Sequence, residues 1–398
     1  MTDLPDYREA LRQALTGIEP FHEVQSVALN TAAGRVLRES IAADRDLPPF
    51  DRAQMDGYAL RAAEVGRIEA WPVVHTISAG MSAQLDVPTG ACVAIATGAP
   101  LPGDVDTVIQ HELSDRSDPV RFTIDSIEPG HAVHRRGADA KRGDVLVDED
   151  TLLGSQQIGI AAIVGKSQLA VARRPRAIVL TSGDEVLPID QPLRNYQIRN
   201  SNGPMVRELL RRIGADPTEH RHILDDREAT IGSVGDALER CELLITVGGI
   251  SAGERDYFPA SFKAYGVESS LHGAAIQPGR PIFVGRPPNG AIIIGLPGNP
   301  VSVLACTCLF IWPIVRTLLG LEPSLPWRTL ELAEVVTPNP NRRAYRPAAL
   351  LDNDRAKVPP WAGSGDLVHT AGTDGLIELP VQPEPVPPGT RVRFLPYP

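Results

Sequence analysis

Residues 175–320 carry the most regular pattern of hydrophobic and polar positions in the chain. Apolar runs of strand length alternate there with segments in which apolar residues recur at helical spacing. The strand candidates are AIVLTSGDE, HRHILDD, ELLITVGG and AIIIG; the helix candidates are NGPMVRELLRRIGA, REATIGSVGDALERC, DYFPASFKAYG and an apolar segment from Pro300 to about Leu319. This alternation predicts an α/β domain whose doubly wound parallel sheet is covered by helices on both faces.

On either side of residues 175–320, most of the predicted elements are short strands. An N-terminal amphipathic helix over MTDLPDYREALRQAL precedes β-type segments such as VVHTISAG, CVAIATG, DTVIQHE and RFTIDSI. They predict an antiparallel or barrel-like β-rich module, inserted into a domain that resumes near RRGADAKRGDVL. Short strands broken by Pro and Gly predict a small C-terminal β domain. The expected domains are 1–44 with 139–174, 45–138, 175–322 and 327–398.

Composition narrows the class of protein. The 398 residues are 42% hydrophobic and 22% charged, which is typical of a globular chain. The net charge of −10 argues against nucleic acid or an anionic membrane as the main partner. The N-terminus lacks the pattern of a signal peptide, and the apolar run from Val301 to Ile314 is too short to span a bilayer and contains Pro313. We therefore expect a cytoplasmic protein.

Three unusual loops follow predicted strands of the α/β domain, at the sheet edge where such folds bind ligands. In LPGNPVS, Asn299 suits a helix N-cap, Pro300 suits the first helical position, and Gly298 allows a tight turn. A helix N-terminus with free N–H groups is a ready anion site. A well-capped helix without a ligand explains the same residues.

Acidic side chains stand in the other loops. Glu185 in TSGDE could serve Mg²⁺, a ribose or a turn; Asp225 in ILDD could serve a metal or cap the next helix. The loop VGGISAGERDY combines Gly248, Gly249, Ser251 and Asp256, and its glycines let a backbone approach a ligand closely. Ser251 and Asp256 suit an oxyanion or a Mg²⁺-bound phosphate, whereas Asp256 could also cap a helix beginning at Tyr257.

Further loops carry polar groups that are not diagnostic singly. Arg280 lies between glycine and proline in QPGRP, where a rigid backbone would aim its guanidinium at an oxyanion. Asp56, Thr97 and Asp139 stand in glycine-containing loops of the first half. Such loops on several domains favour one interdomain cleft over many unrelated turns.

Eight motifs in this order resemble the molybdopterin molybdenumtransferases, the MoeA-like family that includes the E domain of gephyrin and a plant molybdenum-insertion enzyme. They are PPFDRAQMDGYA, ATGAPLPGDVDTVI, RRGADAKRGDVL, TSGDEVLP, QIRNSN, VGGISAGERDY, QPGRPIFVG and LPGNPVSV, and they span nearly the whole chain. The resemblance implies insertion of molybdate into adenylated molybdopterin with release of AMP, assisted by Mg²⁺. It also implies an elongated N-terminal domain, a MogA-like α/β domain, a C-terminal β-barrel-like domain, and a homodimer whose cleft uses both chains. The preceding adenylyltransferase and molybdoenzyme acceptors are the other partners implied.

The resemblance also carries over site residues. It implies that Asp256 and Asp225 work with Mg²⁺, with Asp226 leaving the register open, and that Ser251 acts beside them. The positions that would contact the cofactor nucleotide or face the cleft are Glu185, Gly248, Gly249, Gly298, Asn299, Pro300, Asp56, Thr97 and Asp139. Those that would receive molybdate are Gln277, Arg280, Pro281, Arg346 and Ser364.

The chain departs from the family at several of these positions. Gln277 and Arg280 stand where both are often Lys, and Asn200 stands where an acid is frequent. An amide at 277 removes a Coulomb contribution of about 1–4 kcal/mol, so weaker molybdate binding and a steeper dependence on Arg346 are expected. Two alternatives stay open: an adenylyltransferase that makes adenylated molybdopterin, and a scaffold that binds cofactor without turnover.

Overall fold

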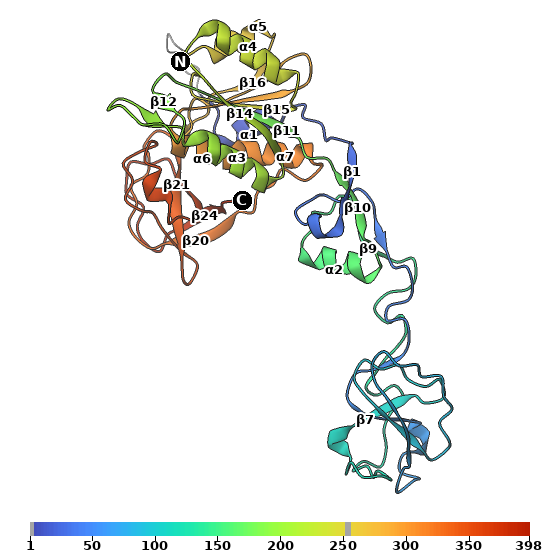
Figure 1. The fold of residues 1–398 in the computed structure, drawn as a ribbon. Coiled ribbons are helices and arrows are strands. Elements are labelled where there is room, and N and C mark those ends of the chain that lie inside the picture. Colours follow the sequence, from blue (N-terminus) through green and yellow to red (C-terminus); the bar gives the residue numbers. More distant parts are fainter. Residues whose placement is uncertain (1–3, 251–255) are drawn as a thin grey trace. The chain divides into compact units, whose positions relative to one another are not determined.

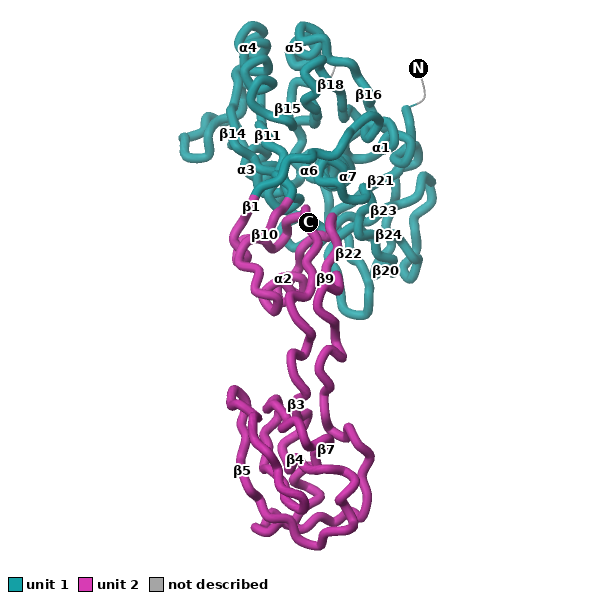
Figure 2. Tube along the Cα trace, turned by 90° about the vertical axis from the view of Figure 1, so that its right-hand side faces the viewer, with its two compact units in different colours: residues 1–25, 172–398 teal, residues 26–171 magenta. Residues whose placement is uncertain are grey.

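The structure is a computed structural model that describes residues 4–250 and 256–398 (Figure 1). The chain divides into two compact units, one of residues 1–25 with 172–398 and one of residues 26–171 (Figure 2). Each unit is described by itself.

The larger unit is built on a six-stranded sheet. Its strands in spatial order are β14 (Asp216–Ile223), β11 (Arg176–Ser182), β15 (Leu243–Val247), β19 (Ile292–Leu296), β18 (Phe283–Arg286) and β16 (Glu268–His272). The first four run parallel, as predicted, whereas β18 and β16 form an antiparallel edge. β15 and β19 are buried along their whole length, which explains why their sequences are continuously apolar rather than alternating.

Helices cover both faces of this sheet (Figure 1). They are α4 (Arg227–Leu238) and α5 (Phe258–Ala264) on one face, and α3 (Asn202–Ile213), α6 (Pro300–Cys306) and α7 (Trp312–Leu318) on the other. Alternate residues of β11 point to the face covered by α4 and α5. Ile178 and Leu180 pack there in one buried cluster with Val234 of α4 and Phe258 of α5. The doubly wound α/β prediction is confirmed.

The segment Pro300–Leu318 is one helical rod in which a π-helical turn, Thr307–Ile311, joins α6 to α7. By length and composition this helix of 19 residues is long and apolar enough to cross a membrane, so the prediction that the run is too short was wrong: Pro313 does not end the helix. Pro313 cannot donate to the carbonyl of Leu309 four residues earlier. The Tyr7 hydroxyl donates to that carbonyl instead, at 3.3 Å. Because 83% of the rod is buried, it has the character of a core helix.

The N-terminal helix α1 (Tyr7–Leu15) belongs to this unit, which differs from the expectation that residues 1–44 join 139–174. Asp6 caps it by accepting from the N–H of Glu9. The Tyr7 ring packs edge-on against Phe310, at 5.7 Å between ring centroids, and against Tyr345, at 5.4 Å. These aromatic contacts explain why the helix lies here.

The C-terminal domain is a closed five-stranded barrel, which confirms the barrel-like prediction. Its strands are β21 (Arg343–Leu351), β22 (Arg355–Lys357), β20 (Arg328–Leu332), β24 (Arg391–Pro396) and β23 (Gly375–Leu379), and β23 pairs again with β21. Closure leaves no free sheet edge. A short strand from the α/β domain, β17 (Ile276–Gln277), adds to β21 in parallel and so joins the two domains.

The smaller unit contains the predicted β-rich insertion. A four-stranded sheet of β5 (Val73–Ile77), β6 (Cys92–Ile95), β4 (Gly57–Leu60) and β7 (Thr107–Gln110) has a buried cluster on each side. It is mixed rather than antiparallel, since β5 runs parallel to β6. The segments before and after it form a separate core around α2 (Ser155–Ile163) with the pairs β1 (Val24–Ala28)–β10 (Gln168–Ala172) and β2 (Ile41–Ala42)–β9 (Val145–Val147). The short pair β3 (Arg52–Ala53)–β8 (Val133–His134) lies where the insertion begins and ends.

Candidate active site

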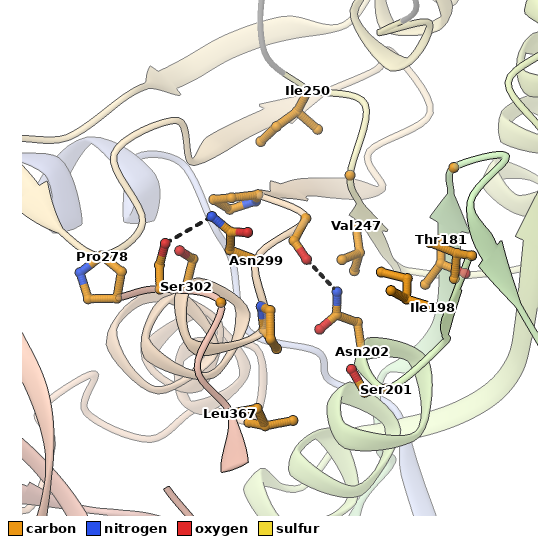
Figure 3. A pocket seen from close by; sticks show the side chains of 18 of the residues that line it. Thr181, Ile198, Ser201, Asn202, Val247, Ile250, Pro278, Asn299, Ser302 and Leu367 are labelled. Atoms are coloured by element: carbon orange, nitrogen blue, oxygen red, sulfur yellow. Dashed lines mark hydrogen bonds between the residues drawn. The ribbon is translucent and has the colours of Figure 1, made fainter. Parts of the chain in front are cut away.

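A pocket of about 1070 Å³ opens at the carboxyl edge of the six-stranded sheet (Figure 3). The three loops singled out in the sequence all line it, through Ser182, Gly183 and Glu185, through Gly248, Gly249, Ile250 and Asp256, and through Pro297, Gly298, Asn299 and Pro300. The QPGRP segment and residues 361–368 of the C-terminal domain complete the wall. One pocket within the larger unit therefore gathers most of the predicted site residues.

Acidic side chains mark one part of this pocket. Asp225 and Asp226 follow β14 after one residue, Leu224, and they have different roles. The Asp226 carboxylate caps α4 by accepting from the N–H of Ala229 at 2.8 Å, whereas Asp225 is half-buried and lines the pocket. The backbone N–H of Asp225 donates to the Asp184 carboxylate at 3.0 Å, which fixes the turn. This arrangement favours Asp225 as the residue that faces a ligand.

Asp256 lines the same pocket and is half-buried. The N-cap residue of α5 is Tyr257, so Asp256 is not its cap and the alternative reading of Asp256 as a helix cap is wrong. Ser251 lies outside the described residues, and its predicted role stays a prediction. Among the described residues, no group of three or more His, Cys, Asp or Glu side chains is placed to hold a metal ion.

A buried hydrogen-bond network supports the SGDE loop from below. The hydroxyl of Thr181, at the end of β11, accepts from Asn200 Nδ2 at 2.8 Å and lies 3.0 Å from His222 Nδ1. His222 Nε2 donates to the carbonyl of Gly183 at 3.1 Å. Because that carbonyl can only accept, Nε2 carries the proton, and in the neutral ring Nδ1 accepts from Thr181.

Asn200 also ties this network to α3, because its Oδ1 accepts from the N–H of Gly203 at 3.0 Å. Asn200 thus donates and accepts at once while nearly fully buried. An ionised acid at this position would lose the donor to Thr181, which gives a structural reason for the amide in this chain. Burial also lowers the pKa of neighbouring His220, which lies 3.2 Å from the Thr181 hydroxyl.

Asn299 is the N-cap residue of α6, as predicted, but its side chain does not cap the helix. Its Nδ2 donates to the hydroxyl oxygen of Ser364 at 2.8 Å, which is the dashed line drawn from Asn299 in Figure 3. The N–H of Val301 donates to the Ser364 carbonyl at 2.9 Å. The Ser364 carbonyl of the C-terminal domain therefore accepts from Val301, whose N–H is one of the helix N-terminal donors that the sequence analysis proposed for an anion. Among the described residues, the Ser364 hydroxyl accepts from Asn299 and donates to no protein group, so its proton can be donated to a ligand.

The basic part of the pocket lies around the QPGRP segment. Arg280 is exposed and lines the pocket together with Gln277, Pro281 and Ser364. Gly279 packs so closely on α6 that the Cys306 thiol donates to its carbonyl at 3.7 Å. The QPGRP segment is therefore held closely against α6.

Arg346 is not among the lining residues, which differs from its predicted direct contact with molybdate. Its guanidinium lies 5.1 Å over the ring of Trp361, which does line the pocket. Burial lowers the pKa of Arg346. Arg346 supports the wall of the pocket from behind.

Comparisons with known proteins agree with this arrangement. Three family models match: "MoeA N-terminal region (domain I and II)" over residues 6–165, "Probable molybdopterin binding domain" over 178–317, and "MoeA C-terminal region (domain IV)" over 329–397. A molybdopterin molybdenumtransferase of Synechocystis sp. is 34% identical over 87% of this chain and 88% of its own. The chain belongs to the molybdopterin molybdenumtransferase family.

Other relatives extend the match. A molybdopterin molybdenumtransferase of Staphylococcus aureus is 31% identical over 89% of this chain and 87% of its own. A crystal structure titled as a molybdopterin biosynthesis MoeA protein from Pyrococcus horikoshii has a TM-score of 0.85 at 26% identity, over 99% of this chain and all of that one. The predicted family, fold class and assignment as a transferase are confirmed.

Three of the predicted site residues lie in the smaller unit. The Asp56 carboxylate accepts from the N–H and the hydroxyl of Thr97, at 2.7 and 2.8 Å, and these bonds lower the pKa of Asp56. Asp139 instead lies 2.8 Å from His134 Nε2. The structure thus pairs two of the three, and all three side chains are exposed.

Several lining residues were missed in the sequence, among them Arg199, Asn202, Ser302, Arg342 and Trp361. Asn202 Nδ2 donates to the carbonyl of Gly298 at 2.7 Å and so links α3 to the LPGNP loop (Figure 3). Arg199 and Asn202 stand inside the motif QIRNSN and Ser302 inside LPGNPVSV, and those motifs were the available signal.

Proposed function

We propose that this protein inserts molybdenum from molybdate into adenylated molybdopterin, with cleavage of the adenylate and release of AMP. The supporting observation is that acidic groups and oxyanion-binding groups line one pocket. Carboxylates of Glu185, Asp225 and Asp256 and the glycine loops lie at the sheet edge, and Arg280 and the Ser364 hydroxyl lie with them in the same wall. Such a pocket suits a substrate that carries a phosphoanhydride together with a tetrahedral oxyanion.

The loop at Gly248 and Gly249 would let the phosphates approach the backbone closely, since both glycines have positive φ and carry no side chain. The N–H of Gly248 already donates to the carbonyl of Leu296 at 3.0 Å, so the N–H of Gly249 is the donor proposed for a phosphate. Water then attacks one phosphorus of the anhydride and the bridging P–O bond breaks, giving AMP and molybdopterin, each with its own single phosphate. Arg280 and the Ser364 hydroxyl would orient molybdate by donating to its oxygens. The two halves of the site are held together by the hydrogen bond from Asn299 to Ser364.

Magnesium fits the acidic residues. Mg²⁺ is commonly held by one or two protein carboxylates plus substrate phosphates, so a cluster of three protein ligands is not required. Asp225 and Asp256 would hold it, and the ion would neutralise charge that develops on the phosphates.

The test is incubation of the purified protein with adenylated molybdopterin, Mg²⁺ and molybdate. AMP should appear in an amount equal to the substrate consumed. With molybdopterin and ATP in place of adenylated molybdopterin, no adenylated product should form. Formation of that product would instead identify an adenylyltransferase, and retention of adenylated substrate without AMP release would identify a cofactor-binding scaffold.

We further propose that the protein acts as a cytoplasmic homodimer that receives its substrate from an adenylyltransferase and delivers cofactor to molybdoenzymes. The support is family membership and the exposed, ionised Asp56 held by Thr97, which suits a group that faces a ligand. Light scattering should give twice the chain mass of 42.8 kDa. A mass of 42.8 kDa at working concentration would contradict the dimer.

A further inference from the structure

We propose that Arg342 of the C-terminal domain is an oxyanion-binding residue that supplies, beside Gln277, the positive charge which that amide lacks. This inference rests on the proposed function and adds a residue to the part of its site that receives a tetrahedral dianion. It was not visible in the motifs, because residues 277 and 342 are far apart in sequence.

The backbone brings the two residues together. Strand β17 pairs in parallel with β21, so that Ile276 lies opposite Arg343 and Gln277 opposite Ala344. The N–H of Arg343 donates to the carbonyl of Ala275 at 3.3 Å. Arg342 directly precedes β21, and its guanidinium Nη1 lies 3.5 Å from the carbonyl of Ile276. The guanidinium is thus placed beside the residue that precedes Gln277.

A turn fixes the backbone at this position. The Asn339 side-chain oxygen accepts from the N–H of Asn341 at 2.8 Å and from the N–H of Arg342 at 2.9 Å. Such a turn holds the start of the Arg342 side chain in one place before the strand begins. Arg342 is therefore supported on both sides, by this turn and by β17.

The two adjacent arginines have different partners. Arg343 pairs with the buried Glu378 carboxylate at 2.7 Å, which is a structural ion pair inside the domain. Arg342 is half-buried and lines the pocket, and its contact with Ile276 is at the limit of a hydrogen bond. Within the described residues, its other N–H groups meet no carboxylate in an ion pair. Its charge is therefore available to a ligand.

Gln277 shows the complementary feature. Its Oε1 atom is buried and has no hydrogen-bond partner in the described part of the chain. A neutral amide at the pocket wall brings no Coulomb attraction for a dianion, whereas a planar guanidinium can donate two parallel hydrogen bonds to neighbouring oxygens of one oxyanion. The sequence-based expectation of weak binding considered position 277 without this neighbour.

The alternative is a purely structural role, in which Arg342 stabilises the pairing of β17 with the barrel by donating to the carbonyl of Ile276. The two roles need different chemistry. A glutamine at 342 keeps an N–H donor and loses the charge, whereas a lysine keeps the charge and loses the planar fork. A fastening role depends on the donor, and an oxyanion role depends on the charge.

The affinity of the purified full-length protein for molybdate and for tungstate is measured by equilibrium dialysis. Arg342→Gln should weaken binding about 10- to 100-fold, from loss of one close charge, and Arg342→Lys should stay within about threefold of wild type. In the Arg342→Gln background, Gln277→Lys should recover most of the lost affinity. The control Arg355→Gln removes the same charge from β22, at an exposed residue that does not line the pocket, and should bind as wild type.

Wild-type affinity in Arg342→Gln, or no recovery by Gln277→Lys in that background, would overturn the proposal. Thermal unfolding of each variant separates loss of binding from loss of fold. Failure of the proposed function is distinguished by the AMP assay: Arg342-dependent oxyanion binding without AMP release would refute the function and retain this site.

Discussion

Replacing Asp225 with asparagine is expected to slow AMP release from adenylated molybdopterin by about 100-fold or more while the fold stays intact. The Asp225 carboxylate lines the pocket, and charge neutralisation at a metal-assisted phosphoryl centre contributes several kcal/mol, where each 1.4 kcal/mol is about tenfold in rate. The rate is measured in single turnover, across a series of Mg²⁺ concentrations, with molybdate saturating.

The adjacent acid provides a matched control. Asp226→Asn makes the same chemical change one residue away, and asparagine is as good an N-cap as aspartate, so both stability and rate should match wild type. If Asp226→Asn is the slow variant and Asp225→Asn is not, the assignment of the two acids is reversed.

Gly279→Ala adds one methyl group, and we expect it to disrupt the basic part of the pocket more than the same addition at any other position there. Gly279 has φ of +104°, and an added Cβ would lie 2.3 Å from the buried Cys306 sulfur. The strained backbone alone costs about 1–3 kcal/mol. The segment must also move away from α6, and this movement displaces Arg280 and Pro281. Molybdate affinity measured by dialysis should fall about tenfold or more, together with the unfolding temperature.

Two further variants separate the steric cost from the backbone cost. Gly290→Ala places a Cβ at φ of +85° with no atom within 4 Å, so it should lower stability modestly and leave molybdate binding unchanged. Combining Gly279→Ala with Cys306→Ala removes the clash and should recover part of the lost affinity. Wild-type molybdate affinity in Gly279→Ala would show that the position of this loop does not control the oxyanion.

The sequence predicted those features whose signal is local. The strand and helix rhythm of residues 175–320 follows from burial on one or two faces, and the three loops fall at one sheet edge because parallel strands end together. The N-cap position of Asn299 was predicted for the same reason. These features need no knowledge of distant residues.

Other features depend on contacts between segments far apart in the chain. The Asn299 amide turns away from its own helix because Ser364 of the barrel offers an acceptor. The helix α1 was predicted as an amphipathic helix, but its packing was not predicted, since Tyr7 packs on Phe310, far away in the sequence. The resemblance implied that Arg346 receives molybdate, whereas Arg342 lines the pocket and Arg346 lies over the ring of Trp361. No local pattern encodes which of two nearby arginines faces a pocket.

We propose that one pocket both cleaves the adenylate and receives the oxyanion, with Asp256 acting at the cleavage. This is tested by AMP release from adenylated molybdopterin with Mg²⁺, with molybdate or tungstate, in the wild type and in Asp256→Ala. We expect one AMP per substrate from the wild type and a rate at least about 100-fold lower from Asp256→Ala, whose oxyanion binding is unchanged. Absence of AMP release from the wild type, or equally fast release from Asp256→Ala, would refute this role of the pocket.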